Sequence, residues 1–312
     1  MAGYRGRFAP SPTGDLHLGG ACTALCAWLA ARASGGRLVL RMEDLDTPRV
    51  VEGSAERILD DLRWLGFDWD EGPDVGGDFG PYVQSARTSH YEQALTQLRK
   101  QGYTYECDCS RAEISREASA PHPGEEGPIY SGRCRKIVGP SRTFRRTPAT
   151  RLAVPQGIVR VQDAVQGARE VDVASETGDF VLRRGDGLFA YQLAVVVDDL
   201  EMGITEVVRG ADLWSSSARQ ALIAMLLGAQ PPAWAHAPLV VSEDGTRLAK
   251  RAHGVAVRHH REEGRDPRWL VARMAHALGL AGPEERIEPR ELISRFSWEK
   301  VRPGPISIAL GD

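Results

Sequence analysis

The N-terminal segment RFAPSPTGDLHLGG, from Arg7 to Gly20, constrains the fold of this chain more than any other stretch. It begins like the end of a strand and continues through a Pro- and Gly-containing turn, and Gly19 and Gly20 precede an apolar periodicity that predicts a helix. Glycines let the backbone approach a ligand closely, and free N–H groups at a helix start favour an anion. The segment therefore predicts a strand–loop–helix unit that binds phosphate, with His17 placed to hydrogen-bond a phosphate oxygen.

Glycine-bearing turns also open many α/β domains that bind no phosphate, so the rest of the chain must agree with this interpretation. The segment Arg37–Glu43 predicts a second strand, and helices are predicted over 53–65 and 89–100. Alternating strands and helices predict a parallel sheet, whose ligand sites lie at the carboxyl ends of its strands. Glu43 lies at such an end.

A second set of predicted elements follows. Short β-like runs lie within 151–182, and the strongly apolar run Leu188–Val197 is predicted to be a strand that ends at the pair Asp198–Asp199. Helices are predicted over 216–227 and from about Asp266 onward. We expect an α/β nucleotide-binding fold whose halves span 1–102 and 187–255, split by an insertion over 103–186 and followed by a short helical region over 256–312.

Composition limits the class of protein. A length of 312 residues allows about two domains, and 42% hydrophobic with 26% charged residues is typical of soluble globular proteins. No apolar run approaches membrane-spanning length and the N-terminus has no signal-peptide core, so a cytoplasmic protein is expected. A net charge of −3 excludes nucleic-acid coating by bulk positive charge, although arginines gather at 142–146 and 258–261. Such clusters are more often solvated surface than binding sites.

Five cysteines are an odd number, which does not suit a complete disulfide framework. Cys22 and Cys26 lie one turn apart on the first predicted helix and are interpreted as small core residues. Cys107, Cys109 and Cys134 occupy a Gly-rich stretch with little periodicity, and three thiolates suit tetrahedral zinc if a fourth donor joins them. His122 is the generic candidate for that fourth donor, and simple packing of close cysteines is the alternative.

The basic run Arg247–Arg251 follows a Gly-containing turn. Taken alone, it is interpreted more readily as a solvent-facing loop than as a functional one.

The first segment resembles the signature of class I aminoacyl-tRNA synthetases, in which HLGG at 17–20 corresponds to the HIGH motif. RFAPSPTG followed by LH is the form of the glutamyl-type enzymes. The basic run resembles the KMSKS loop of the same class, with Lys250 at the second lysine. Arg247 stands at the first lysine and Ala249 at the serine, so charge is kept and one hydroxyl is lost.

The resemblance implies ATP and Mg²⁺ as reaction partners and assigns residues to them. His17 and Lys250 would be catalytic, and together with Gly19 and Gly20 they would bind ATP. Glu43 would bind the α-ammonium of L-glutamate, while Arg7 and Arg209 would bind carboxylate. From the residues alone, an ion pair between Arg209 and Asp212, or a core role for Tyr191, is an equal alternative. The implied glutamate-binding set is Arg7, Phe8, Ala9, Pro10, Ser11, Glu43, Tyr191 and Arg209.

A narrower resemblance is to the glutamyl-queuosine tRNA(Asp) synthetases, a shortened branch of the glutamyl-type family. It rests on the set Cys107, Cys109, Tyr130 and Cys134, on Glu206, and on a C-terminal part too short for an anticodon-binding domain. It implies that this set holds one structural Zn²⁺. It also implies a monomer that activates L-glutamate with ATP and passes the glutamyl group to queuosine in the anticodon of tRNA(Asp).

Two other functions remain open from the sequence. One is a truncated glutamyl-tRNA synthetase that charges an ordinary tRNA 3′ end. The other is a non-catalytic zinc-bearing RNA-binding module with a synthetase-like fold, which the alanine at 249 makes worth testing.

Overall fold

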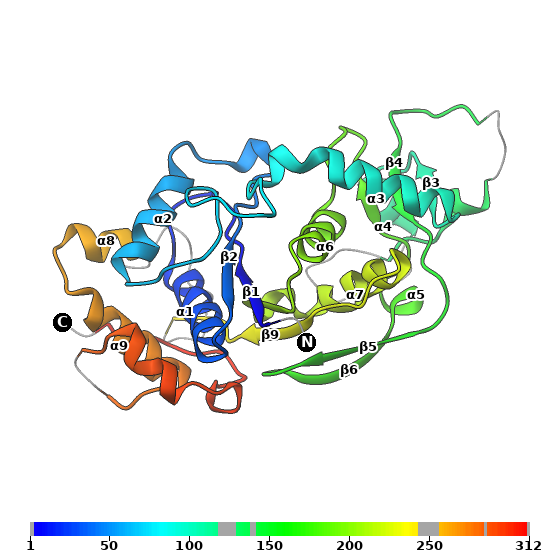
Figure 1. The fold of residues 1–312 in the computed structure, drawn as a ribbon. Helices are drawn as coiled ribbons and strands as arrows, with labels where there is room; N and C mark the ends of the chain where they lie inside the picture. Colours follow the sequence, from blue (N-terminus) through cyan, green and yellow to red (C-terminus); the bar gives the residue numbers. More distant parts are fainter. Residues whose placement is uncertain (1–2, 118–128, 138–141, 243–255, 284–285, 311–312) are drawn as a thin grey trace.

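The computed structural model describes residues 3–117, 129–137, 142–242, 256–283 and 286–310. Its centre is a six-stranded sheet in the order β2-β1-β8-β9-β5-β6, shown in Figure 1. All neighbouring pairs are parallel except β5–β6, which is an antiparallel hairpin at one edge. The predicted parallel sheet is confirmed. The strands are β1 (Arg5–Phe8), β2 (Arg37–Leu40), β5 (Ile158–Asp163), β6 (Gly167–Asp172), β8 (Glu206–Gly210) and β9 (Ala233–Ala237).

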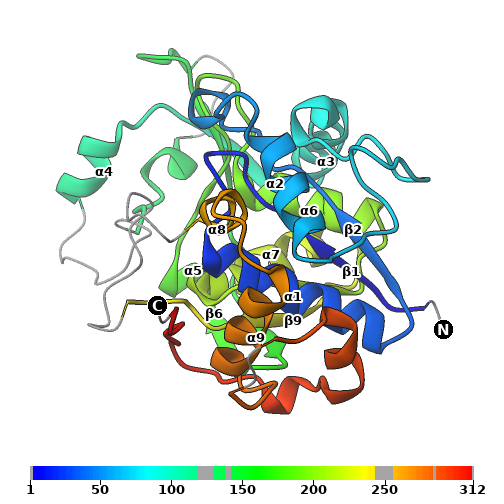
Figure 2. The same cartoon turned by 90° about the vertical axis from the view of Figure 1, so that its left-hand side faces the viewer.

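Helices cover both faces of this sheet. Figures 1 and 2 show α1 (Leu18–Ala33) and α9 (Pro267–Leu278) on one side, with α6 (Tyr191–Glu201) and α7 (Ser217–Leu226) on the other. Successive strand residues point to opposite faces, so Val208 of β8 joins the core under α1 while Val207 joins the core under α6. The result is a three-layer α/β arrangement with two hydrophobic cores.

Helix α1 begins where the opening motif predicted. His17 is its N-cap, and the His17 Nδ1 accepts a hydrogen bond of 3.0 Å from the Gly20 backbone N–H. Most of the helix is buried in the core that it shares with α9, which explains its predominantly apolar sequence. The other predicted helices are also confirmed as α2 (Ser54–Trp64), α3 (Thr88–Lys100), α7 and α9.

The strand prediction for Leu188–Val197 is wrong. Residues Tyr191–Glu201 form helix α6, whose residues Leu193–Asp199 are all buried. A run that is apolar at every position has no period, so periodicity does not distinguish a buried helix from a buried strand. The helical rise of about 1.5 Å per residue keeps Asp199 only about two turns from Tyr191, and both therefore lie near the same site.

Part of the predicted insertion forms a smaller antiparallel sheet, whose strand order is β3-β4-β7. The predicted insertion over 103–186 is shared between the two sheets, because its β5–β6 hairpin pairs with β9. Its domain boundaries stay a prediction. The remaining elements are β3 (Thr104–Cys107), α4 (Arg111–Glu117), β4 (Ala149–Leu152), α5 (Val173–Glu176), β7 (Val181–Arg183) and α8 (Val257–Glu262).

The C-terminal helix α9 has a recognisable start and end. Its N-cap Asp266 accepts a hydrogen bond from the Arg268 backbone N–H, Pro267 occupies the first turn, and Gly279 ends the helix at a φ of 87°. Its buried face packs in the same core as α1. Among the residues that the structure describes, no helix is both long and apolar enough to cross a membrane.

Helices α2 and α8 meet at a buried carboxylate. Asp61 is fully buried, and its carboxylate lies 3.3 Å from the Arg261 guanidinium without a hydrogen-bond partner. Burial outweighs the attraction of Arg261 and raises the pKa of Asp61 to about 6. Because this folded-state pKa lies above the ordinary value of 3.8, the stability that the group contributes is present below about pH 3.8. It is lost as the pH rises through about 6.

We therefore expect Asp61→Asn to stabilise the fold above pH 6. The free energy of unfolding should rise on the order of 2 kcal/mol at pH 8 and by about a third of that at pH 4.5. Urea denaturation at the two pH values measures this difference, with Asp60→Asn as the control because Asp60 lies on the same helix and is 56% exposed. An equal effect of Asp61→Asn at both pH values would contradict the assignment.

Candidate active site

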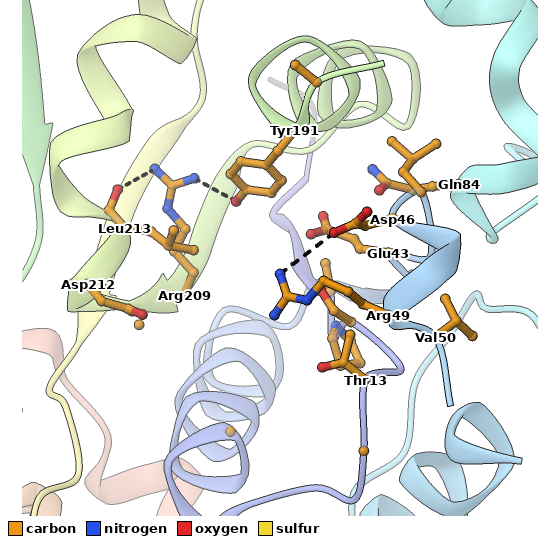
Figure 3. Close-up of a pocket in the computed structure, with 18 of the residues that line it drawn as sticks. Thr13, Glu43, Asp46, Arg49, Val50, Gln84, Tyr191, Arg209, Asp212 and Leu213 are labelled. Carbon is orange, nitrogen blue, oxygen red and sulfur yellow. Dashed lines mark hydrogen bonds and ion pairs between the residues drawn. The ribbon is translucent and has the colours of Figure 1, made fainter. Parts of the chain in front are cut away.

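A single cavity of about 1320 Å³ opens at the carboxyl ends of strands β1, β2, β8 and β9. This is where the parallel sheet predicted a ligand site. Figure 3 shows Glu43, Tyr191 and Arg209 directed into it from three different elements. Its wall contains every predicted substrate residue within the described ranges: Arg7, Phe8, Ala9, Pro10, Ser11, His17, Gly19, Gly20, Glu43, Tyr191 and Arg209.

The loop after β1 is held in place by backbone hydrogen bonds. The carbonyls of Phe8 and Pro10 accept from the N–H groups of Arg41 and Glu43 at 3.1 and 3.0 Å, which continues the β1–β2 pairing past the strands. Gly14 has a φ of 147°, which residues with a side chain rarely adopt, and its carbonyl accepts from the hydroxyl of Ser54 at 2.5 Å. The loop is therefore fixed to both β2 and α2.

Arg7 and Glu43, both predicted to bind glutamate, are the ends of a chain of four side chains with alternating charge. Asp199 Oδ1 lies 3.4 Å from Arg7 Nε and 2.8 Å from a terminal nitrogen of Arg41. The other terminal nitrogen of Arg41 lies 3.1 Å from Glu43 Oε1. Arg7 also donates to the Val208 carbonyl at 2.6 Å. Because each charge in this chain has an opposite neighbour, buried groups that would be costly alone keep one fixed geometry.

Glu43 lies at the cavity end of this chain. Burial raises its pKa, and the positive charges of Arg41 and Arg7 partly oppose that effect. The Glu43 carboxylate pairs with Arg41 through Oε1, and its remaining lone pairs can accept hydrogen bonds from another group. Glu43 is therefore suited to accept hydrogen bonds from a ligand ammonium group.

Arg209, at the end of β8, has acceptors for all its guanidinium N–H groups. Its Nε donates to His236 Nε2 at 2.9 Å. One terminal nitrogen donates to Gln220 at 2.6 Å and lies 3.4 Å from the Tyr191 hydroxyl, and the other donates to Ser217 at 2.9 Å and to the Leu213 carbonyl at 3.2 Å. Tyr191 and Leu213 line the cavity, as Figure 3 shows, so two of these N–H groups face it.

Several residues of this site were not predicted from the sequence. Arg41 and Asp199 connect Arg7 with Glu43, and His236 donates no hydrogen to Arg209 but accepts one from it. The sequence indicates Asp199 only as the end of a predicted strand. The available signal was a set of charged residues inside or directly after strongly apolar runs. A charge at such a position is rarely buried unless it is paired.

The candidate metal ligands form a compact cluster. The Sγ atoms of Cys107, Cys109 and Cys134 lie within 4.8 Å of one another. The Tyr130 hydroxyl lies 3.5 Å from the sulfur of Cys107 and 3.6 Å from that of Cys109. Tetrahedral zinc, with bonds of about 2.3 Å to sulfur, spaces neighbouring ligand atoms roughly 3.7 Å apart. The four side chains fit such an ion.

A second layer of polar groups supports the cluster. The Cys134 backbone N–H donates to the Tyr130 oxygen at 2.8 Å, and Arg142 donates to Cys134 Sγ at 3.0 Å. Burial opposes ionisation of the Cys134 thiol, but the hydrogen bonds from Tyr130 and Arg142 lower its pKa to about 7. Arg142 is also paired with Asp108 at 2.6 Å, so this arginine stabilises the cluster region.

We expect Cys134→Ala to abolish retention of a metal ion. The wild-type chain should keep about one equivalent of zinc through dialysis against a weak chelator, and the variant should keep none, because the remaining ligands leave the tetrahedral set incomplete. Mass spectrometry of the metal content measures the difference. Cys22→Ala is the matched control, because Cys22 is buried in α1 away from the cluster. Equal zinc in both variants would exclude Cys134 as a ligand.

Two features predicted from the sequence lie outside the described residues. They are His122 and the basic run Arg247–Arg251, which contains Ala249 and Lys250. The assignment of Lys250 to ATP therefore rests on the sequence resemblance.

Comparison with known proteins agrees with this geometry. The family model of the class I tRNA synthetases (E and Q), catalytic domain, matches residues 4–306. A glutamyl-Q tRNA(Asp) synthetase of Symbiobacterium thermophilum is 46% identical over 97% of this chain and 95% of its own length. One of Nocardia farcinica is 48% identical over 94% of this chain and 89% of its own.

Longer relatives match as well. A glutamate–tRNA ligase 2 of Syntrophus aciditrophicus is 41% identical over 95% of this chain, which spans 62% of that relative. A solved glutamate-tRNA synthetase of Elizabethkingia anophelis superposes with a TM-score of 0.85 at 31% identity, over 99% of this chain and 68% of its own. With a family model over nearly its whole length and relatives of this similarity, the chain belongs to the class I tRNA synthetases (E and Q).

Proposed function

We propose that this chain activates L-glutamate with ATP and transfers the glutamyl group to queuosine in the anticodon of tRNA(Asp). In the first step a carboxylate oxygen of glutamate attacks the α-phosphorus of ATP, giving glutamyl-adenylate and pyrophosphate. In the second, a hydroxyl of the queuosine cyclopentene-diol attacks the glutamyl carbonyl and AMP leaves. The observation that carries the proposal is the cavity, in which Arg7, Glu43 and Arg209 converge beside the start of α1.

The cavity residues divide into two chemical sets. Glu43 would accept hydrogen bonds from the glutamate ammonium group, and Arg7 and Arg209 would attract carboxylate, for which the planar arginine fork is suited. Phe8, Ala9, Pro10, Ser11 and Tyr191 would form the remaining wall around glutamate. Activation of this kind needs positioning and charge stabilisation rather than a protein nucleophile.

The start of α1 would hold the ATP phosphates. His17 Nδ1 accepts the Gly20 N–H, so a neutral His17 ring carries its proton on Nε2, where it can donate to a phosphate oxygen. Gly19 and Gly20 allow close approach of the backbone, and the helix N-terminus favours negative charge. Lys250 would add a positive charge to the developing phosphate charge, and Mg²⁺ would accompany ATP.

The acceptor is inferred from the relatives and from the insertion. The relatives that match this chain over nearly their full length carry the name glutamyl-Q tRNA(Asp) synthetase, whereas the glutamate–tRNA ligases extend well beyond it. Exposed arginines suited to RNA phosphates line the cavity: Arg49, Arg111 and Arg184. Zinc held by Cys107, Cys109, Tyr130 and Cys134 would stabilise the insertion. We further propose that the chain acts as a monomer in the cytoplasm, where its tRNA substrate is found.

Glutamate-dependent exchange between ATP and labelled pyrophosphate tests the first step. The zinc-loaded protein with Mg²⁺ should catalyse exchange with L-glutamate and far less with L-glutamine, because arginine N–H groups do not find equivalent acceptors on an amide. A non-catalytic RNA-binding module would give no exchange with either amino acid, which would overturn the proposal.

A further inference from the structure

Arg209, His236 and Asp163 form a buried chain of three hydrogen-bonded side chains. His236 lies next to Arg209 on the neighbouring strand, because the two residues are register partners in the β8–β9 pair. The His236 Nε2 accepts from Arg209 Nε at 2.9 Å, and the His236 Nδ1 lies 2.5 Å from the carboxylate of Asp163 at the end of β5. The three residues are at most 5% exposed.

The hydrogen bonds determine where the proton of the His236 ring lies. Arg209 Nε always carries hydrogen, so His236 Nε2 must be an unprotonated acceptor, and the ring proton must be on Nδ1, where it faces Asp163. Burial lowers the pKa of His236, and the positive charge of Arg209 adds to that effect against the opposing influence of Asp163. The ring is therefore neutral and has a single tautomer.

The hydrogen bond to His236 also determines which edge of the Arg209 guanidinium can bind a ligand. A guanidinium can bind a carboxylate through its two terminal nitrogens or through Nε and one terminal nitrogen. His236 occupies Nε, so only the end with the two terminal nitrogens remains. At that end the contacts to Tyr191 and to the Leu213 carbonyl, at 3.4 and 3.2 Å, are the longest that Arg209 makes, and both groups line the cavity. A ligand carboxylate can replace these two contacts.

We propose that Asp163 and His236 are positioning residues for glutamate binding: Asp163 holds His236 in its Nδ1–H tautomer, and His236 then directs the terminal nitrogens of Arg209 toward a substrate carboxylate. This inference rests on the proposed function and adds two residues to it. Neither residue lines the cavity. Both act through Arg209.

Asp163→Asn tests the proposal with almost no change in shape. Asp163 Oδ1 accepts from the backbone N–H groups of Val165, Gln166 and His236, so the oxygen of an asparagine must stay at that position. The NH₂ group of the asparagine then faces His236 Nδ1 and donates a hydrogen bond to it, so the ring proton moves to Nε2. There it meets the Arg209 Nε–H, and two donors face each other. We expect the KM for glutamate in pyrophosphate exchange to rise about tenfold or more. The KM for ATP should change less than twofold.

A pair of substitutions at position 236 separates positioning from general structure. His236→Gln can present an amide oxygen to Arg209, whereas His236→Asn is long enough only to donate to Asp163. We expect near wild-type KM for glutamate in the first and about a tenfold rise in the second. Equal effects of the two substitutions, or KM values for ATP that rise as much as those for glutamate, would overturn the proposal.

Nitrogen-15 NMR of labelled histidine gives a readout independent of activity. The wild-type chain should show His236 as the Nδ1–H tautomer, and Asp163→Asn should show the Nε2–H tautomer. An Nε2–H ring in the wild type would overturn the inference. A wild-type chain with the expected tautomer but no glutamate-dependent exchange would overturn the proposed function instead, and with it the role in glutamate binding.

Discussion

Replacement of Arg209 by alanine is expected to lower kcat/KM for glutamate by about 10³-fold or more in pyrophosphate exchange, because the two proposed hydrogen bonds to the substrate carboxylate would be lost together. The substitution also removes the Arg209 donors to Gln220 Oε1 and to His236 Nε2. The KM for ATP should change far less, since the proposed phosphate contacts come from the start of α1 and not from Arg209.

Arg209→Lys is the matched comparison. It keeps the charge but has no planar fork, so we expect an intermediate loss of about 10²-fold. Thermal unfolding of both variants shows whether the fold is retained. Arg184→Ala serves as a control at a half-exposed position that lines the cavity without contacting Arg209. A loss below tenfold in Arg209→Ala would contradict carboxylate binding at this residue.

Replacement of Lys250 by alanine is expected to lower the maximal rate of adenylate formation by about 10²- to 10³-fold while changing glutamate affinity less than threefold. A positive side chain that contacts the phosphates mainly when negative charge develops on them stabilises the transition state more than the bound substrate. Single-turnover formation of glutamyl-adenylate, together with equilibrium binding of glutamate, separates the two effects.

Lys250→Arg is the control, because it keeps the positive charge at the same position of the chain. It should retain more activity than the alanine variant. Equal losses in adenylate formation and glutamate binding for Lys250→Ala would contradict the assigned role and would favour a structural one.

The parts of the fold that the sequence predicted correctly depend on local rules. The α1 start needs only a His cap, two glycines and an apolar periodicity, all within a few positions. Helix α9 likewise has Asp266, Pro267 and Gly279 at its two ends. Such signals act over one or two turns and are visible in the sequence. Helix α6 has no comparable signal, because its residues Leu193–Val197 are apolar at every position and its N-cap Ala190 makes no side-chain hydrogen bond.

The supporting network of the site could not be predicted for a different reason. Arg7 and Asp199 are separated by 192 positions, and His236 and Asp163 by 73. Their contacts depend on the strand order, which places β8 between β1 and β9 and brings β5 beside β9. The resemblance supplied the residues that would touch substrate, but it did not supply the charges that hold them. Those became visible only when the topology was known.

Transfer of labelled L-glutamate to purified tRNA(Asp) tests the central claim most directly. Two preparations of this tRNA, with queuosine and with unmodified guanosine at the same anticodon position, should be compared in the presence of ATP, Mg²⁺ and zinc-loaded protein. We expect label on the queuosine-containing tRNA only, carried by the modified anticodon nucleoside and not by the 3′-terminal adenosine. Equal labelling of both preparations, or labelling of a tRNA 3′ end, would contradict the account.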